Sequence, residues 1–429
     1  MFKKQKLVEA PLGYWEEKSY MLAIPKKEEN DEILKKSLER IASIKGVKIK
    51  GNHYDREKNL FYVTIIYEKE EYEIGFYVGD VSIPDYYLNK NYLFKEEEKE
   101  LLLNAKRALT LFMKFHNHPK KDYHLQIKLA YAMVPDLIGV MDESAENVLP
   151  KKWVELSAKS SVEPSAKDLF LVQAVSEEKG SVWLHTHGLC RCGITELEIL
   201  DSKNENYQNH YNLIATYAMY LIDKKSEVDP RNNGAYIGRL INGYPVVVTC
   251  KSWIEGLKEY KKIDLGGEKD RQSGHNSWTS IVFLYKSEKD EEKGKVSKIT
   301  DYNQLWGDNP IFFISNEETS RMKALAIERF NYVKESFKNK ENKILIKVGL
   351  PLEEKGQFEH IWFELLELKE NKFKAKLTQE PYDVKDLHTG DEAWYTTQEI
   401  TDWIIYTKDF AVNPNNAYLL EIEKETKRK

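Results

Sequence analysis

The stretch "GSVWLHTHGLCRCGITELEIL", residues 180–200, decides how the middle of this chain folds. Its two ends, "SVWLHTH" and "ITELEIL", alternate between apolar and polar residues, as the strands of a half-buried antiparallel pair do. Gly188 and Gly193 enclose the segment between these runs, and we expect a six-residue loop there. The stretch is therefore predicted to form a β-hairpin.

The pairing across this loop gathers polar side chains on one face of the hairpin. A symmetric register gives three opposite pairs: His187 with Ile194, His185 with Glu196, and Trp183 with Glu198. Because side chains two positions apart share a face, one face carries His185, His187, Glu196 and Glu198. The other face carries Val182, Leu184, Leu197 and Ile199 toward the core. A slip of one residue would turn the whole set over.

This polar face is compatible with three roles. Imidazoles with a carboxylate and an open position hold zinc or another transition metal, which makes His185, His187 and Glu196 candidate ligands. A carboxylate beside a histidine also orients it and raises its basicity, so the four residues are candidate catalytic groups for acid–base chemistry. The third role, cross-strand pairing of His and Glu on a wetted face, is the commonest.

The cysteines add little to this site. Cys190 and Cys192 lie in the loop with C-x-C spacing, which differs from the C-x2-C pair of structural zinc sites. Cys250 lies in an apolar run and is expected to serve packing. The odd total of three cysteines argues against a disulfide framework and favours a reducing compartment, so we expect a cytoplasmic protein.

The chain before the hairpin predicts an α+β domain. Residues 19–24 read as a strand, 30–46 as a capped helix, 60–80 as a hairpin, and 94–115 as one long helix with glutamates at its positive end. Helices on one face of an antiparallel sheet would bury these apolar stripes. "FHNHP" would put His116 and His118 at the negative end of the long helix, where cations are favoured, so a structural role is predicted for both.

The length of 429 residues predicts about three domains. The small, polar run at 156–168 is the best linker, and a second boundary is expected near 315–320. The predicted domains are an N-terminal α+β domain at 1–160, a central α+β domain at 166–316 with the hairpin, and a β-rich domain at 320–429. A helix at 321–337 opens the last part, and short alternating strands after it indicate a small curved sheet or a barrel-like module. The fold class is thus multi-domain α+β.

Several functional classes find no support in the sequence. The net charge of -5 gives no basic surplus, so we expect no nucleic-acid partner. The longest apolar run, residues 213–222, is too short to cross a bilayer, and no membrane association is expected. Neither a phosphate-binding glycine loop nor a nucleophile elbow is present. The polar stretch "DRQSGHNSW", residues 270–278, fits a surface turn better than a functional loop.

The last part of the chain also resembles a known family. Residues 359–406 contain a W-x-E strand, the turn "LTQEP", a Gly-Asp turn and a closing Asp-Trp pair, and they resemble the bacterial family called domain of unknown function 2314. The whole chain, with "WLHTHGL" and "ELEI" at its centre, resembles the larger family called domain of unknown function 4026. The family motif H-T-H-G-L-x-R-x-G-x-x-E-L-E falls on His185, Thr186, His187, Gly188, Leu189, Arg191, Gly193, Glu196, Leu197 and Glu198. Cys190 and Cys192 fall at its variable positions.

The resemblance implies no established activity, and two hypotheses stay open. The first is a cytoplasmic binding or interaction protein with a protein partner, of which an immunity-type role is one concrete version. It needs no cofactor. The alternative is a hydrolytic enzyme, metal-dependent or acid–base, that uses the face formed by His185, His187, Glu196 and Glu198. The sequence leaves open whether the protein is an enzyme.

Overall fold

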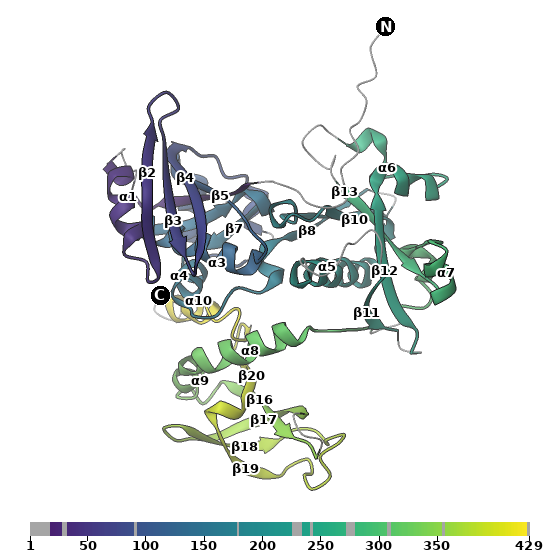
Figure 1. The fold of residues 1–429 in the computed structure, drawn as a ribbon. Coiled ribbons are helices and arrows are strands. Elements are labelled where there is room, and N and C mark those ends of the chain that lie inside the picture. Colours follow the sequence, from purple (N-terminus) through teal and green to yellow (C-terminus); the bar gives the residue numbers. More distant parts are fainter. Residues whose placement is uncertain are drawn as a thin grey trace. The chain divides into compact units, whose positions relative to one another are not determined.

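A computed structural model gives the fold of the protein (Figure 1) and describes residues 18–27, 32–89, 92–177, 180–224, 234–240, 243–271, 279–306, 310–353 and 357–426. The fold is α+β with three mostly antiparallel sheets, as the sequence predicted. Contacts divide the chain into two units. The first unit consists of 1–92, 100–149 and 164–313, and the second of 93–99, 150–163 and 314–429. The predicted linker at 156–168 is where the chain returns from the second unit to the first.

The first sheet has seven strands in the order β2-β3-β4-β5-β1-β6-β7. In chain order these are β1 (Lys18–Pro25), β2 (Val47–Asp55), β3 (Leu60–Tyr67), β4 (Glu70–Asp80), β5 (Arg107–Lys114), β6 (Leu137–Asp142) and β7 (Asn147–Pro150). Helices α1 (Glu32–Ala42) and α3 (Pro119–Met133) pack on each other and on the central strands. Alternate residues of β4, among them Tyr72, Ile74 and Phe76, are buried under these helices. The predicted arrangement of helices on one face is confirmed for this sheet.

The single long helix predicted over 94–115 is wrong in its second half. Helix α2 (Glu96–Leu103) ends early, and the next residues form β5, which pairs with β4 on one side and β1 on the other. Residues 108–113 are buried on both faces of the sheet. A continuous apolar run satisfies the helical period and the needs of a central strand equally well, so the pattern alone could not separate the two. As a consequence, His116 and His118 do not end a helix: they lie between β5 and the N-terminal end of α3.

The second sheet holds the predicted hairpin and has the order β15-β11-β12-β13-β10-β9-β8, with the short β14 on β13. Its strands are β8 (Leu171–Ser176), β9 (Ser181–His187), β10 (Glu196–Lys203), β11 (Ala235–Arg239), β12 (Pro245–Ser252), β13 (Thr279–Tyr285), β14 (Ser297–Lys298) and β15 (Ile311–Phe312). Strands β10 and β13 run parallel. Helix α5 (Tyr207–Asp223) packs on β10 and β11, and α6 (Trp253–Gly256) packs on β12 and β13. The short helix α7 (Glu288–Glu292) follows β13.

The second unit contains the third sheet, in the order β19-β18-β17-β16-β20-β21. Its strands are β16 (Lys343–Pro351), β17 (Phe358–Leu368), β18 (Lys372–Leu377), β19 (Glu392–Thr396), β20 (Ile400–Tyr406) and β21 (Ala411–Val412). The helices of this unit are α4 (Lys151–Lys159), α8 (Asn316–Glu328), α9 (Phe330–Ser336) and α10 (Leu419–Thr426). Trp403 of β20 is fully buried and donates its indole N–H to the carbonyl of Ala326 in α8, 3.0 Å away. This tryptophan anchors the contact between α8 and the third sheet.

Among the described residues, no helix combines the length and the apolar character needed to cross a bilayer.

Candidate functional site

The hairpin forms, but its register differs by two residues from the predicted one. His185 lies opposite Glu198, whereas the symmetric pairing had placed it opposite Glu196. The connection is longer than predicted because it contains a 3-10 turn, Cys190–Cys192, and β10 starts only at Glu196. Since a shift of two residues keeps each side chain on the same face, His185 and Glu198 still share a face.

This face is buried rather than wetted. His185 is 1% exposed and Glu198 is 0% exposed. The ring of His185 lies between two others, with the Trp183 ring centroid at 4.5 Å and the His187 centroid at 4.9 Å. The hairpin therefore has core on both faces, and its imidazoles pack in an aromatic cluster with tilted and edge-on contacts.

Glu198 has a full set of partners. Its Oε1 accepts hydrogen bonds from Arg271 Nη2 at 2.8 Å and from the Thr279 hydroxyl at 2.9 Å, and its Oε2 accepts one from the Trp183 indole at 2.9 Å. Burial raises the pKa of Glu198, and the Arg271 guanidinium acts against that rise. The guanidinium also lies 4.3 Å from the ring centroid of Trp253. The carboxylate and its arginine form a buried ion pair that holds β10 and β13 to the segment that follows α6.

Arg271 corrects another expectation, because the stretch 270–278 was predicted to be a surface turn. Arg271 is only 9% exposed and takes part in the core of the second sheet. The rest of that stretch, residues 272–278 with His275 and Asn276, lies outside the described residues.

Glu196 shapes the loop through hydrogen bonds to its backbone. Its Oε1 accepts from the backbone N–H groups of Gly188 at 2.8 Å and Cys190 at 3.0 Å, and its Oε2 accepts from the Thr186 hydroxyl at 2.6 Å. Gly188 has a φ of +111°, and a Cβ there would lie 2.5 Å from the carbonyl oxygen of Leu169. Only glycine fits that turn, which Glu196 then holds closed.

His187 is 9% exposed, and of the four predicted residues only Glu196 is half-buried rather than buried. Its Nε2 lies 3.0 Å from the Gln173 side-chain oxygen, and its Nδ1 lies 3.5 Å from a Glu146 carboxylate oxygen. The four residues predicted for the site are thus brought close in the fold, but each carboxylate is already engaged by neighbouring donors.

Arg191, in the loop of the same motif, joins the two sheets of the first unit. Its guanidinium binds both oxygens of Asp142 in β6, at 2.7 and 2.9 Å, and its Nη1 lies 3.2 Å from the Ser19 hydroxyl in β1. The ring of Tyr123 lies 4.7 Å from the guanidinium carbon. Such a two-point ion pair in the interior fixes geometry, so the loop of the motif works as a structural junction.

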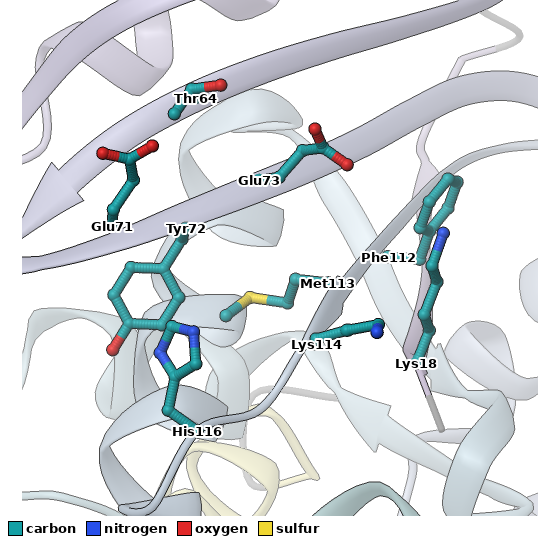
Figure 2. A pocket seen from close by; sticks show the side chains of 9 residues that line it. All are labelled: Lys18, Thr64, Glu71, Tyr72, Glu73, Phe112, Met113, Lys114 and His116. Atoms are coloured by element: carbon teal, nitrogen blue, oxygen red, sulfur yellow. The ribbon is translucent and has the colours of Figure 1, made fainter. Parts of the chain in front are cut away.

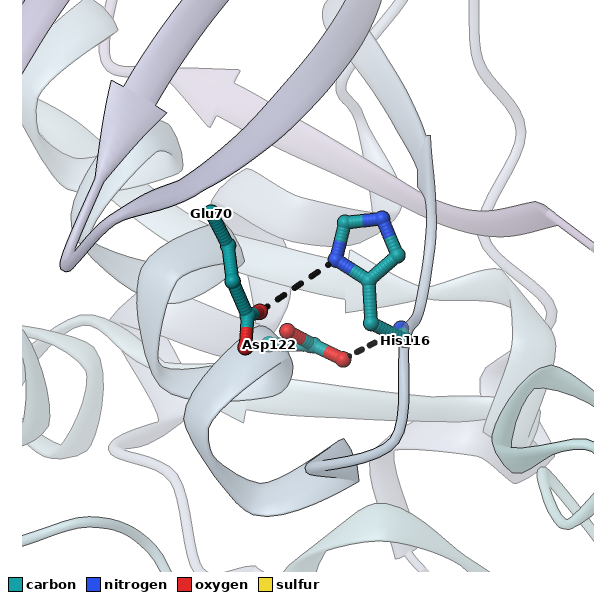
Figure 3. A group of neighbouring side chains, drawn as sticks. All are labelled: Glu70, His116 and Asp122. Atoms are coloured by element: carbon teal, nitrogen blue, oxygen red, sulfur yellow. Dashed lines mark hydrogen bonds and ion pairs between the residues drawn. The ribbon is translucent and has the colours of Figure 1, made fainter.

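A second group of polar side chains lies at the end of β5, where no site was predicted. Glu70, His116 and Asp122 each offer one donor atom, and these atoms lie within 4.8 Å of one another (Figure 3). Among the residues that the structure describes, this is where three such donors converge. His116 Nδ1 lies 3.4 Å from Glu70 Oε2, and the backbone N–H of His116 donates to Asp122 Oδ2 at 2.6 Å. The Tyr72 hydroxyl lies 2.8 Å from Asp122 Oδ1 and 2.9 Å from Glu70 Oε2.

The two carboxyl groups of this cluster are tuned in opposite directions. Burial raises the pKa of Asp122, against the hydrogen bonds from Tyr72 and from the His116 backbone. Burial also acts on Glu70, but the hydrogen bond from Tyr72 and the charge of Lys121 outweigh it and lower the pKa of that group. Asp122 is fully buried whereas the Glu70 side chain is 33% exposed, which explains the difference.

Beside this cluster lies a hollow of about 280 Å³ (Figure 2). Tyr72 and His116 form one edge of the hollow, and Lys18 and Phe112 lie on the other side of it. Its remaining lining comes from Thr64, Glu71, Glu73, Met113 and Lys114. The hollow thus combines two aromatic rings with charges of both signs.

The hollow adjoins a row of rings across the sheet face that α1 and α3 leave uncovered. His53, Tyr62, Gly75, Phe112 and Tyr20 are directly paired, one after another, across β2, β3, β4, β5 and β1. The successive ring centroids lie 4.7, 6.2 and 5.2 Å apart. Phe112 lies over Gly75, where a Cβ would come within 2.2 Å of its ring. We call His53, Tyr62, Phe112 and Tyr20 the aromatic row.

Sequence reasoning missed both features for one reason. With residues 107–114 taken as helix, Phe112 could not be aligned with Tyr62, and His116 could not be placed beside Tyr72. The usable signal was "FHNHP", in which Pro119 after two histidines is typical of the first turn of a helix. That signal would have placed a helix start at Pro119, rather than a helix end near His116.

Comparison with known families supports the resemblance drawn from the hairpin motif and the C-terminal turns. Residues 19–164 match the N-terminal part and residues 172–283 the C-terminal part of a family described as protein of unknown function DUF4026. Residues 313–417 match DUF2314, described as an uncharacterised protein conserved in bacteria. The chain therefore belongs to the DUF4026 family and carries a C-terminal DUF2314 domain. No curated protein and no solved structure matches it.

Proposed function

We propose that the protein is a binding protein, and that it takes a protein partner on the aromatic row and the hollow beside it. The aromatic row carries this proposal. Rings that are only partly covered supply large contact area at small entropic cost, and they dominate the energetics of protein interfaces. His53 is exposed, and Tyr62 and Tyr20 are half-buried.

The charges around the row favour a protein over a polyanion. Lys18 lies 4.6 Å from the centroid of Phe112, and Lys114 lies on the neighbouring strand. Glu71 and Glu73 line the same hollow, and Glu71 forms an ion pair with Lys50 at 2.6 Å. A groove for nucleic acid needs a clear basic surplus along its length. Mixed charges around an apolar centre are instead the usual rim of a protein interface.

A cytoplasmic location belongs to the same proposal, because the three cysteines are buried free thiols. An immunity-type role, in which the partner is a toxin, is one version of it and rests on family analogy. The hydrolytic alternative on His185, His187, Glu196 and Glu198 is the weaker candidate. Two of those side chains are almost fully buried, and both carboxylates already accept hydrogen bonds.

The test compares, in the bacterial host, the wild-type chain with one double variant of the aromatic row and one matched control. We expect the wild type to retain one protein partner stoichiometrically, and a His53→Ser, Tyr62→Ser variant to lose it. Tyr382→Ser, which removes a ring that is 91% exposed in the second unit, should retain the partner. Equal retention by all three proteins would refute the proposed surface. If the wild type, but not the double variant, shifted the electrophoretic mobility of single-stranded oligonucleotides, the surface would be assigned to nucleic-acid binding instead.

A further inference from the structure

The Tyr72 hydroxyl has two short contacts with carboxylate oxygens but only one hydrogen to donate. A hydroxyl donates a single hydrogen, and an ionised carboxylate only accepts. Tyr72 nevertheless lies within hydrogen-bond distance of both Asp122, at 2.8 Å, and Glu70, at 2.9 Å. With both carboxylates ionised, one of these short oxygen–oxygen contacts has no hydrogen in it. Something positive, either an added proton or a cation, has to stabilise the arrangement.

Asp122 raises the same question independently. Its side chain is 0% exposed, and no lysine or arginine in the described part of the chain forms an ion pair with it. An ionised carboxylate buried without a cation is costly. Lys121 does not fill the role, because the ion pairs of its Nζ are with Glu70 Oε1 at 3.7 Å and Glu68 at 3.4 Å, and not with Asp122.

We propose that Glu70, His116 and Asp122 bind a divalent transition metal ion, Zn²⁺ or Mn²⁺. The imidazole decides between a proton and a metal, since a shared proton needs no third donor atom. Two carboxylate oxygens and one imidazole nitrogen are donors that zinc and manganese accept, whereas Mg²⁺ and Ca²⁺ prefer oxygen throughout. Tyr72 is a positioning residue that holds the two carboxylates toward each other.

The surroundings leave room for one further ligand. Three protein donors make an open zinc site, and His116 lines the hollow of about 280 Å³ (Figure 2). A water molecule or a group of the bound partner can reach the ion from that side. This inference does not rest on the proposed function: the metal donors are not members of the aromatic row, although His116 also lines the hollow of the proposed surface.

The experiment is calorimetric titration of the full-length chain, purified without a histidine tag and treated with EDTA, with ZnCl2, MnCl2 and MgCl2. One Zn²⁺ or Mn²⁺ per chain is expected to bind, and Mg²⁺ to bind far more weakly. His116→Ala and Glu70→Gln should each weaken binding at least about 100-fold, because each removes one of three protein donors. His118→Ala is the matched control: it removes an exposed histidine two positions away and should leave binding unchanged.

Absence of zinc and manganese binding by the wild type would overturn the inference, and so would unchanged binding by the His116→Ala and Glu70→Gln variants. Glu70→Gln keeps the side-chain volume of a partly exposed residue, so it gives an answer even where His116→Ala destabilises the fold. The aromatic-row variant His53→Ser, Tyr62→Ser should keep the metal. Loss of the partner and loss of the metal are therefore separate outcomes.

Discussion

Histidines and carboxylates meet at two places in the first unit, and the two places differ in what surrounds them. At the hairpin, Glu198 has an arginine, a hydroxyl and an indole as donors, and it is sealed from solvent. At the end of β5, Asp122 and Glu70 share one hydroxyl, and the neighbouring His116 lines a hollow. Glu198 of the hairpin has a buried arginine as its ion-pair partner, whereas in the described part of the chain Asp122 of the β5 cluster forms no ion pair with a lysine or arginine.

The types of residue present and the distances between them do not by themselves make a ligand-binding site. The predicted face has the richer set of side chains, with two imidazoles and two carboxylates in one motif. Both carboxylates already accept hydrogen bonds, and His185 and Glu198 are buried, so those groups have little capacity for a ligand. The β5 cluster has fewer groups, but its three donor atoms converge and His116 lines a hollow that a ligand can enter.

The largest expected effect comes from breaking the junction at Arg191. Arg191→Ala would leave the carboxylate of Asp142 buried without its cation, and the free energy of unfolding should fall by about 3 to 5 kcal/mol. Arg239→Ala, at an exposed arginine of the same sheet, should change it by less than about 0.5 kcal/mol. Urea unfolding followed by circular dichroism measures both. A loss below about 1 kcal/mol for Arg191→Ala would show that the motif loop is no structural junction.

The buried His210 of α5 has hydrogen bonds that suit a neutral imidazole. We therefore expect the free energy of unfolding to depend on pH through this side chain. Its Nδ1 lies 2.7 Å from the Ser202 hydroxyl and its Nε2 lies 3.0 Å from the Asn303 side-chain oxygen, a pattern that one neutral imidazole satisfies. Burial lowers the pKa of His210 to about 4, against the hydrogen bond to Asn303.

The direction of the pH dependence follows from this lowered pKa. The unfolded chain takes up this proton first as the pH falls below 6.5, so stability is complete above pH 6.5 and is lost down to about pH 4. The loss amounts to about 3 kcal/mol. His210→Gln should flatten that part of the stability–pH curve in urea unfolding. An unchanged slope in the variant would assign the pH dependence to other groups.

The sequence predicted some elements closely and missed details of others, for reasons that particular residues show. The hairpin predicted over 60–80 has its observed ends, those of β3 and β4, because both runs are rich in β-branched and aromatic residues. The hairpin at 180–200 was predicted, yet its register was two residues off, because the 3-10 turn at Cys190–Cys192 lengthens the loop in a way that glycine positions do not reveal. The error was even, so the faces were correct.

The candidate site at the end of β5 depends on contacts that no local pattern encodes. Tyr72 and Asp122 are 50 positions apart, and they meet only because β5 lies between β4 and β1. Residues 107–114 were taken for helix, since a run buried on both faces satisfies either period. The burial of Glu198 was missed for a related reason: Arg271 reaches it from 73 positions away.

A smaller effect is expected from closing the space under Phe112. Gly75→Ala would place a Cβ 2.2 Å from the Phe112 ring, displacing that ring from the aromatic row and lowering the free energy of unfolding by about 2 kcal/mol. Gly51→Ala in β2 is the matched control, since its Cβ would meet nothing within 4 Å. Partner binding should weaken in the first variant and not in the second. If the Gly75→Ala variant retained the partner fully, the aromatic row would not be part of the binding surface.

The smallest expected effect decides directly between the two histidine clusters. His187→Gln removes the imidazole from the hairpin, but its amide N–H can still donate to Gln173, so the free energy of unfolding should change by less than about 1 kcal/mol. The zinc stoichiometry measured by plasma mass spectrometry should match that of the wild type, and His116→Ala should lose the ion. The reverse result, zinc lost from His187→Gln and kept by His116→Ala, would move the metal to the face that the sequence first indicated. In that case hydrogen-bond saturation, on which the contrast between the two clusters rests, would be no guide to where this protein binds ligands.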